Sequence, residues 1–422
     1  MNKKNIVFAI LLVIFTLFGV FIGRQNKVID VYENDETNIK KSKNMLSMML
    51  ETDVESGSYE MTTRESWPTY GYVFNSMLSK CENGSELSWD DENNIVVMSG
   101  NVSDKCYVYF DKVLTLANYI KEQYNGVQGN NNIYYHDGTL ENGINDDSYR
   151  YAGASSDVNN YVCFGSNASP CPDDNLYRVI GVFDGKVKLI KSDYATKELL
   201  GEDGYYKGYY NKVNAAVNWE YYKGSNLDNI ASYNWDINDN NNNWSESLLN
   251  TINLNTNFIK NIGDGWSNKI AISTWKVGGN TLENIGKQKA AIAYQNEIVK
   301  PVSDSASNGE IDYTAKIGLM YASDYGFAAA PSAWGLDLFY EKDDGYNAVR
   351  DYNWMHMGLY EWAITRNSDS NYQHMFVFVS AGALSSGGGG NRFAARPVFY
   401  LKSSVSYAEG DGSKNLPIRI GD

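Results

Sequence analysis

The hydrophobic pattern begins with one long apolar run, from Ile6 to Ile22, shortly after Lys3 and Lys4. The run is just long enough to span a bilayer core as a helix. Basic residues stay on the cytoplasmic side of such a helix, so the rest of the chain is expected outside the cell. Residues 1–23 are therefore predicted to form an uncleaved transmembrane signal-anchor of a single-pass protein in the cell membrane.

A cleaved signal peptide is the alternative interpretation of this run. Cleavage requires small residues just before the cut. Gly23 could be the last residue removed, but Phe21 stands where a second small residue is needed. The pattern therefore favours the anchor.

After the anchor the pattern changes from polar to strand-like. Residues 24–58 are polar and then helix-like over 38–51, and they are predicted to form a stalk. Residues 59–112 carry short alternating apolar stretches separated by turns rich in Asn, Asp and Gly, which is typical of a small β-module. Residues 113–132 are predicted to be a linker made of a short helix and a Gly/Asn-rich loop.

The remaining residues, 133–422, mix strand and helix patterns and predict one larger α+β domain. Its clearest element is a hairpin, in which alternating strands over 176–183 and 186–190 flank Asp184 and Gly185. An Asp-Gly pair between alternating segments is the strongest short-range hairpin signal, because both turn residues must adopt positive φ.

A helix and three further strands are predicted toward the C-terminus. The helix covers residues 245–262, with Ser245 as its N-cap. The strands cover residues 358–366, 375–380 and 394–402. Between the last two lies a Gly-rich segment, 382–391, which is expected to be exposed because glycine lets a loop take almost any path.

Four cysteines fall into two local pairs, Cys81 with Cys106 and Cys163 with Cys171. Four cysteines allow three pairings, and proximity in the sequence favours this one. Zinc is the alternative, but neither spacing contains the tight C-x2-C unit of thiolate sites. Two disulfides, and hence an oxidising extracellular setting, are predicted.

Composition and charge exclude one class of partner. The formal net charge is −15, and no basic stripe is visible, so no nucleic acid is expected to bind. The chain holds 33 Tyr and 10 Trp, residues whose stiff rings with polar edges suit recognition surfaces. Codon bias toward Asn, Lys, Ile and Tyr explains the tyrosines equally well.

Five segments carry a resemblance to known proteins: Leu176–Gly181, Lys316–Gly326, Trp362–Arg366, Arg396–Leu401 and Gly410–Ile420. With them the chain resembles, over roughly residues 130–420, a family of uncharacterised membrane-anchored surface proteins of gut Firmicutes. The resemblance implies display on the cell surface, and it implies no particular activity because the family is uncharacterised.

A more distant resemblance is to the fold shared by C-type lectins, formylglycine-generating enzymes and the variable proteins of diversity-generating retroelements. In that fold a Trp-bearing strand, a display segment and an Arg-Pro strand follow one another, here Trp362, residues 368–393, and Arg396 with Pro397. The resemblance implies a C-type-lectin-like fold for 133–422. Formylglycine-generating enzymes use a cysteine pair near their C-terminus, whereas this chain has no cysteine after Cys171, so that chemistry is not expected.

Candidate catalytic groups are few. The three histidines are His136, expected to be exposed, His356 and His374, and none belongs to an HExxH, GxSxG or CxH arrangement. No enzyme activity is predicted. An exported hydrolase acting on the cell wall or on glycans, and a structural surface component, remain the alternatives.

Acidic loops give no defined metal site. When Asp236 is aligned with the first position of an EF-hand, Asn241 and Ser247 stand where Gly and Glu are required. Asp343, Asp344 and Gly345 fit an ordinary turn. No cofactor is predicted, although a looser calcium site of the lectin type stays open.

The aromatic and polar residues around the last strands are the best candidates for a binding site. Ligand contacts are predicted for Trp354, His356, Tyr372, His374 and Arg392. Rings that stack on a sugar or peptide, with Asn and His supplying hydrogen bonds, suit a carbohydrate or protein ligand. The competing interpretation places about half of the aromatics here in the core. The sequence therefore predicts a cell-surface recognition or adhesion protein.

Overall fold

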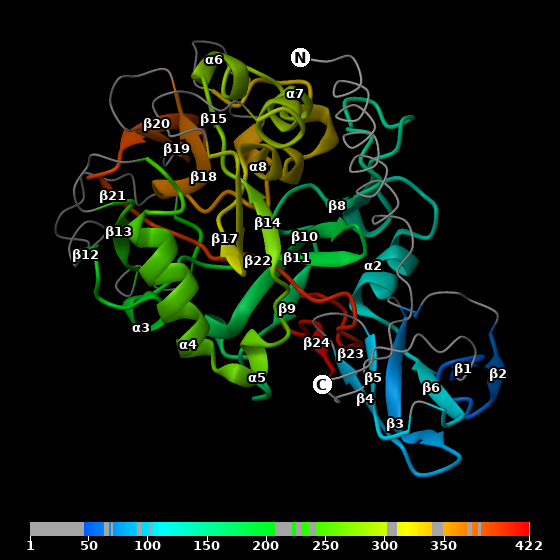
Figure 1. Ribbon diagram of the computed structural model, residues 1–422. Helices are drawn as coiled ribbons and strands as arrows, with labels where there is room; N and C mark the ends of the chain where they lie inside the picture. The colour runs from blue at the N-terminus through cyan, green and yellow to red at the C-terminus, as the bar shows by residue number, and fades with distance from the viewer. Residues whose placement is uncertain are drawn as a thin grey trace, which may run out of the picture. The chain divides into compact units, whose positions relative to one another are not determined.

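The computed structural model describes residues 46–62, 67–68, 71–90, 95–101, 103–206, 222–224, 230–236, 242–301, 310–339, 349–368, 374–378 and 381–421 (Figure 1). The described residues form a mixed α+β protein, as expected, and contain more strand than helix. The chain divides into two compact units, Met1–Leu114 and Thr115–Asp422. The predicted signal-anchor lies outside the described residues, and no helix within them is both long and apolar enough to cross a membrane.

The first unit is built on a four-stranded sheet in the order β2 (Tyr59–Met61), β1 (Leu46–Glu51), β6 (Cys106–Lys112), β3 (Tyr72–Cys81). A separate hairpin joins β4 (Glu86–Asp90) to β5 (Ile95–Ser99). Strand β1 corrects the predicted helical stalk, because residues 46–51 pair in parallel with β6. That partner lies some sixty residues further along the chain, so local periodicity could not reveal the pairing.

The core of the first unit is small and aromatic. Met48, Val108 and Phe110 are buried at its centre, and Phe110 contacts the rings of Trp67 and Trp89. Cys81 and Cys106 lie directly opposite each other on β3 and β6 and form the predicted disulfide.

The second unit centres on a larger sheet in the order β17 (Ile317–Gly318), β22 (Val398–Tyr400), β11 (Lys186–Lys191), β10 (Leu176–Phe183), β8 (Tyr149–Tyr151), β7 (Ile133–Tyr135), with β9 (Tyr161–Cys163) also pairing β10. The predicted hairpin is confirmed as β10 and β11. Its turn residues Asp184 and Gly185 have φ values of 46° and 72°. The second predicted disulfide, Cys163–Cys171, begins at the end of β9.

A second sheet contains most of the predicted C-terminal strands, in the order β15 (Gly279–Asn280), β18 (Glu361–Asn367), β19 (His374–Phe378), β20 (Leu384–Gly388). Phe376, Val377 and Phe378 are all buried, so both faces of β19 are covered. The Gly-rich segment is not the exposed loop that was expected. Residues 384–388 pair along β19, and a Cβ on Gly387 would come within 2.8 Å of the ring of Phe393.

Two helical predictions change in the structure. Helix α2 (Leu116–Tyr124) is not a linker, because its residues Leu116, Ala117 and Ile120 are buried in the core of the second unit. The helix predicted over 245–262 is a π-helix, η6 (Leu249–Phe258), continued by α4 (Ile259–Ile262). Ser247 rather than Ser245 caps it, since its Oγ accepts a hydrogen bond from the N–H of Asn250.

Shorter elements complete the second unit. The helices are α3 (Lys197–Leu200), α5 (Asp264–Ser267), α6 (Leu282–Ile285), α7 (Ala290–Tyr294) with η7 (Gln295–Val299), and α8 (Ala322–Ala328); the 3-10 turns are η1 (Asn130–Asn132), η2 (Asp173–Asn175) and η9 (Pro331–Ala333). The strands are β12 (Tyr205–Tyr206), β13 (Ser232–Asn234), β14 (Ser273–Lys276), β16 (Asp312–Ala315), β21 (Arg392–Phe393), β23 (Tyr407–Glu409) and β24 (Arg419–Ile420). Among the described residues of this unit, six tryptophans are fully buried and therefore structural: Trp235, Trp244, Trp275, Trp334, Trp354 and Trp362.

Candidate functional site

Trp354 is a core residue and not a ligand contact. Its side chain is only 1% exposed, and its indole N–H donates a hydrogen bond to the carbonyl of Tyr151, 2.8 Å away. Its ring also packs against the guanidinium of Arg178. A ring covered on this scale has no surface left to stack on an external sugar or peptide.

His356 is also buried, with an exposed fraction of 3%. Its ring lies edge-on to Tyr325, and its Nε2 has no hydrogen-bond partner among the described residues. Burial, together with the positive charges of Lys223 and Arg350, lowers the pKa of His356 to about 3. The imidazole is therefore neutral at physiological pH, and its side chain is buried rather than on the surface where the ligand contact was predicted.

Of the other three predicted contacts, the structure describes the side chain of Arg392 alone. Arg392 is exposed on β21, where its Nε donates to the side-chain oxygen of Asn234 at 3.3 Å. His374 begins β19 opposite Gly388, but its side chain lies outside what the structure describes. Tyr372 also lies outside the described residues.

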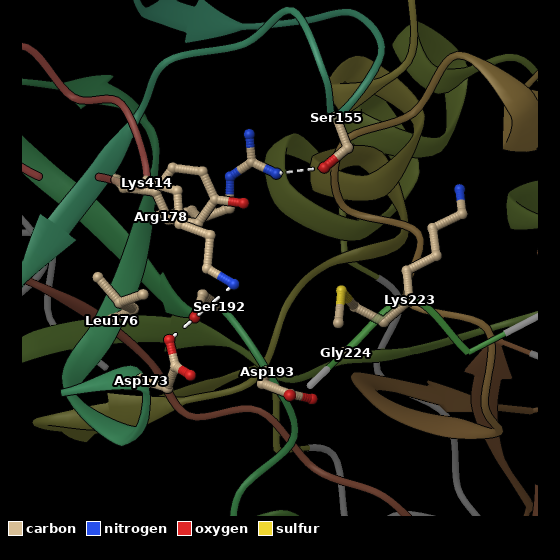
Figure 2. A pocket seen from close by; sticks show the side chains of 11 residues that line it. Ser155, Asp173, Leu176, Arg178, Ser192, Asp193, Lys223, Gly224 and Lys414 are labelled. Atoms are coloured by element: carbon tan, nitrogen blue, oxygen red, sulfur yellow. Dashed lines mark hydrogen bonds and ion pairs between the residues drawn. The ribbon is translucent and has the colours of Figure 1, made fainter. Parts of the chain in front are cut away.

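A small cavity in the second unit offers a better candidate site. It has a volume of about 60 Å³ and lies where β9, β10 and the end of β11 meet the segment around Met357. Figure 2 shows Arg178 and Lys414 approaching from one side and Lys223 from the other. The lining residues are Ser155, Tyr161, Asp173, Leu176, Arg178, Ser192, Asp193, Lys223, Gly224, Met357 and Lys414.

Arg178 is the buried charge of this cavity, with an exposed fraction of 3%. Its guanidinium donates to Ser155 Oγ at 2.8 Å, which Figure 2 shows, and to Asn160 Oδ1 at 2.6 Å. It also donates to the main-chain carbonyls of Val158, at 2.7 Å, and Trp354, at 3.3 Å. All four acceptors are neutral, and an arginine has five N–H donors in total.

The charge of Arg178 therefore lacks the anionic partner that comparable residues have. Buried Arg150 pairs with Asp146, and buried Arg396 pairs with Glu361 at 2.7 Å. Among the described residues, Arg178 forms no such ion pair, and burial lowers its pKa to about 10. A buried cation without a counter-charge is costly, so an anion at this position would be strongly favoured.

A second buried cation lies beside the cavity. Lys191, at the end of β11, is 1% exposed, and its Nζ has no hydrogen-bond partner among the residues described. Burial lowers the pKa of Lys191, while the charges of Asp193 and Asp174 oppose the shift. Asp193 also lines the cavity, and its charge acts on Lys191. The amine of Lys191 therefore lies within electrostatic reach of the cavity.

The acidic residues of the cavity already have partners. Both carboxylate oxygens of Asp193 accept from the hydroxyl of Tyr222 at 2.8 Å. Asp173 faces the amine of Lys414 at 4.0 Å. The lining thus carries three cations and two anions, a local positive excess in a chain whose net charge is −15. The arrangement is suited to holding a small anionic group.

The described residues show neither an exposed His136 nor a clustered metal site. His136 is buried against Phe327 and Trp334 and was wrongly expected to be exposed; burial lowers its pKa to about 3. Within the parts of the chain that the structure describes, no cluster of three or more His, Cys, Asp or Glu could hold a metal ion. Most of the candidate loop from Asp236, and the turn at residues 343–345, lie outside those parts.

Arg178 was not predicted from the sequence, because the predicted site was based on aromatic residues near the last strands. Its signal was nevertheless present: a single arginine in the strand LYRVIGVF, where every other residue is apolar or small. A charged residue in such a strand must be either paired or functional. The predicted region contributes one lining residue, Met357, which was not singled out.

Comparisons with known proteins identify no relative: no family model, no curated protein and no solved structure matches the chain.

Proposed function

We propose that this chain is a single-pass cell-surface recognition protein whose second unit has a C-type-lectin-like fold and binds an anionic group in the cavity at Arg178. The apolar run over 6–22 supports the membrane anchor, and the two disulfides support an extracellular setting. The order of Trp362, the following strands and Arg396 supports the lectin-like fold.

The observation that carries the proposal is the guanidinium of Arg178, buried with only neutral acceptors beside an open cavity. Concave ligand-binding sites hold and orient their ligand through a small number of well-positioned polar groups. Ser155 and Ser192 add hydroxyl groups, and the ring of Tyr161 packs against the guanidinium.

The size of the cavity limits the ligand group. A volume of about 60 Å³ holds on the order of four water molecules. A carboxylate with its attached carbon fits this space, whereas a whole sugar ring does not. The proposed ligand is therefore a larger molecule that inserts a carboxylate, such as an acidic sugar at the end of a glycan, and whose remainder lies outside the cavity.

The test is a binding screen of the full chain against glycans ending in acidic sugars and against the same glycans with the carboxyl group amidated. Peptides with free and amidated C-termini form a second arm, and all arms are run with calcium and with a chelator. Selective binding of carboxylated probes is expected. Equal binding of the amidated probes, or no binding by chain with both disulfides intact, would refute the proposal.

Two variants connect the result to the cavity. Arg178→Gln is expected to weaken binding at least tenfold, and Ser155→Ala to weaken it less. Arg392→Gln is the matched control, since Arg392 is exposed and does not line the cavity. If Arg178→Gln fails to fold, Ser155→Ala and Lys414→Gln, two other changes in the lining of the cavity, still test whether the ligand binds there. Unchanged binding in both variants would place the binding site elsewhere.

A further inference from the structure

Lys188 and Asp324 form a close and deeply buried pair. Lys188 is on β11 and Asp324 on α8, 136 residues apart in the chain. The Lys188 Nζ lies 2.5 Å from Oδ2 of Asp324, and the two side chains are 1% and 3% exposed. The amine nitrogen is therefore held next to the carboxyl group in a site without access to bulk water.

The surroundings of the amine are aromatic. The Nζ atom of Lys188 lies 4.7–5.7 Å from the centres of four rings, those of Phe183, Trp275, Tyr321 and Tyr400. The rings exclude water from the pair, so both the amine and the carboxyl group are desolvated. Once a lysine amine has lost a proton it is a nucleophile, whereas the ammonium is not.

The carboxyl group of Asp324 is fixed and polarised from its other side. Oδ2 also accepts from the main-chain N–H of Tyr321 at 3.0 Å, and Oδ1 faces the guanidinium of Arg150 at 3.7 Å. Asp146 holds Arg150 in place through an ion pair of 2.8 Å. A cation at Oδ1 is positioned to stabilise the negative charge that develops there when a nucleophile adds to the carboxyl carbon.

We propose that Lys188 and Asp324 join in an intramolecular isopeptide bond. A proton passes from the Lys188 ammonium to Oδ2, and the freed Nζ adds to Cγ of Asp324. The bond between Cγ and Oδ2 then breaks, and Oδ2 leaves with this proton and a second proton from Nζ as one water molecule. An amide with one N–H remains, so no oxidant, cofactor or other reactant is needed.

The charge of the buried cluster supports the bond. Arg150 and Lys188 carry two positive charges, and Asp146 and Asp324 carry two negative charges. The amide removes one of each, so the ion pair between Arg150 and Asp146 remains balanced. Two buried charges disappear, which relieves their desolvation cost. The bond would clamp β11 to α8 within the second unit.

Peptide mass spectrometry of the full purified chain tests the proposal. After digestion, the peptide that contains Lys188 and the peptide that contains Asp324 are expected as one joined species, lighter than their sum by one water. The joined species should be absent in Lys188→Arg and Asp324→Ala. Lys186→Arg, two residues along the same strand, is the control and should retain it.

A second readout is the mobility of the reduced, denatured chain on a gel. The wild-type chain, closed into a large loop, should migrate differently from both variants that lack the bond, and Lys186→Arg should migrate like the wild type. Complete recovery of the two separate peptides from correctly disulfide-bonded wild-type protein would overturn the proposal. That result does not depend on whether any variant folds.

Discussion

The indole N–H of Trp354 donates a hydrogen bond to the main-chain carbonyl of Tyr151 across 203 residues of chain, at a distance of 2.8 Å. The contact ties the segment after residue 349 to β8 of the central sheet. On its other side the ring of Trp354 packs against Arg178. Trp354 does not line the cavity and instead supports Arg178, which does.

Trp354→Ala is expected to lower the free energy of unfolding by about 3–5 kcal/mol, because it opens a large cavity in the core. Urea denaturation of the full chain measures this loss. Tyr352→Ala is the matched control, since Tyr352 is 59% exposed and its loss should change stability by less than about 0.5 kcal/mol. Similar effects for both variants would contradict the buried position of Trp354.

Glu297 is expected to make stability fall as the pH rises. Its buried carboxyl accepts from the N–H groups of Ala322 and Ser323 and from the hydroxyl of Thr365. Burial nevertheless raises its pKa to about 7, above the ordinary value of 4.5. The folded state therefore binds more protons than the unfolded state between these pH values, and about 3 kcal/mol of stability is lost across this window.

Denaturation midpoints measured from pH 4.5 to 8 check this expectation by comparing wild type with Glu297→Gln. The wild type should lose stability relative to the variant as the pH rises to 7, and the difference should be constant above it. A difference that does not vary with pH would show that the carboxyl group of Glu297 has an ordinary pKa.

His136 and His356 are expected to act in the opposite direction, at lower pH. Burial lowers the pKa of each to about 3, below the ordinary value of 6.5. Between pH 6.5 and 3 the unfolded state takes up protons that the folded state does not, so stability is lost as the pH falls. Each histidine contributes about 5 kcal/mol over the full window.

His356→Phe checks this expectation, because phenylalanine keeps the ring contact with Tyr325 and cannot be protonated. Thermal unfolding of the variant between pH 3 and 6.5 should depend less steeply on pH than that of the wild type. Identical slopes would indicate that His356 is protonated in the folded state.

The two disulfides are expected to differ in their contribution to stability. Cys81–Cys106 joins residues 25 apart and Cys163–Cys171 residues 8 apart. Since the longer loop restricts the unfolded chain more, removing the first by double alanine substitution should cost roughly 1 kcal/mol more than removing the second. Urea unfolding of the two double variants measures the difference, and a larger loss from the second would contradict the loop-length argument.

Elements fixed by neighbouring residues could be predicted from the sequence. The hairpin of β10 and β11 follows from Asp184 and Gly185, whose positive φ values only a few residue types tolerate. Both disulfides follow from cysteines that are close in the chain. Each of these features depends on a short segment, so its signal is contained in that segment.

Features that depend on distant partners were decided by the tertiary structure. Residues 46–51 have a helix-like pattern but form a strand, because β6 offers a free edge for parallel pairing. The Gly-rich segment 384–388 became a strand because β19 and Phe393 surround it. Trp354 and His356, predicted for a surface, are buried by elements that the linear pattern does not connect to them.

The candidate site shows the same division. The sequence by itself determined that an arginine stands in the apolar strand from Leu176 to Phe183, between alternating hydrophobic residues. Only the tertiary structure decided that its guanidinium meets neutral acceptors from residues 155–160 and 354, beside a cavity. Whether a buried charge is compensated depends on which groups folding brings within a few ångströms of it, and that information is spread over the whole chain.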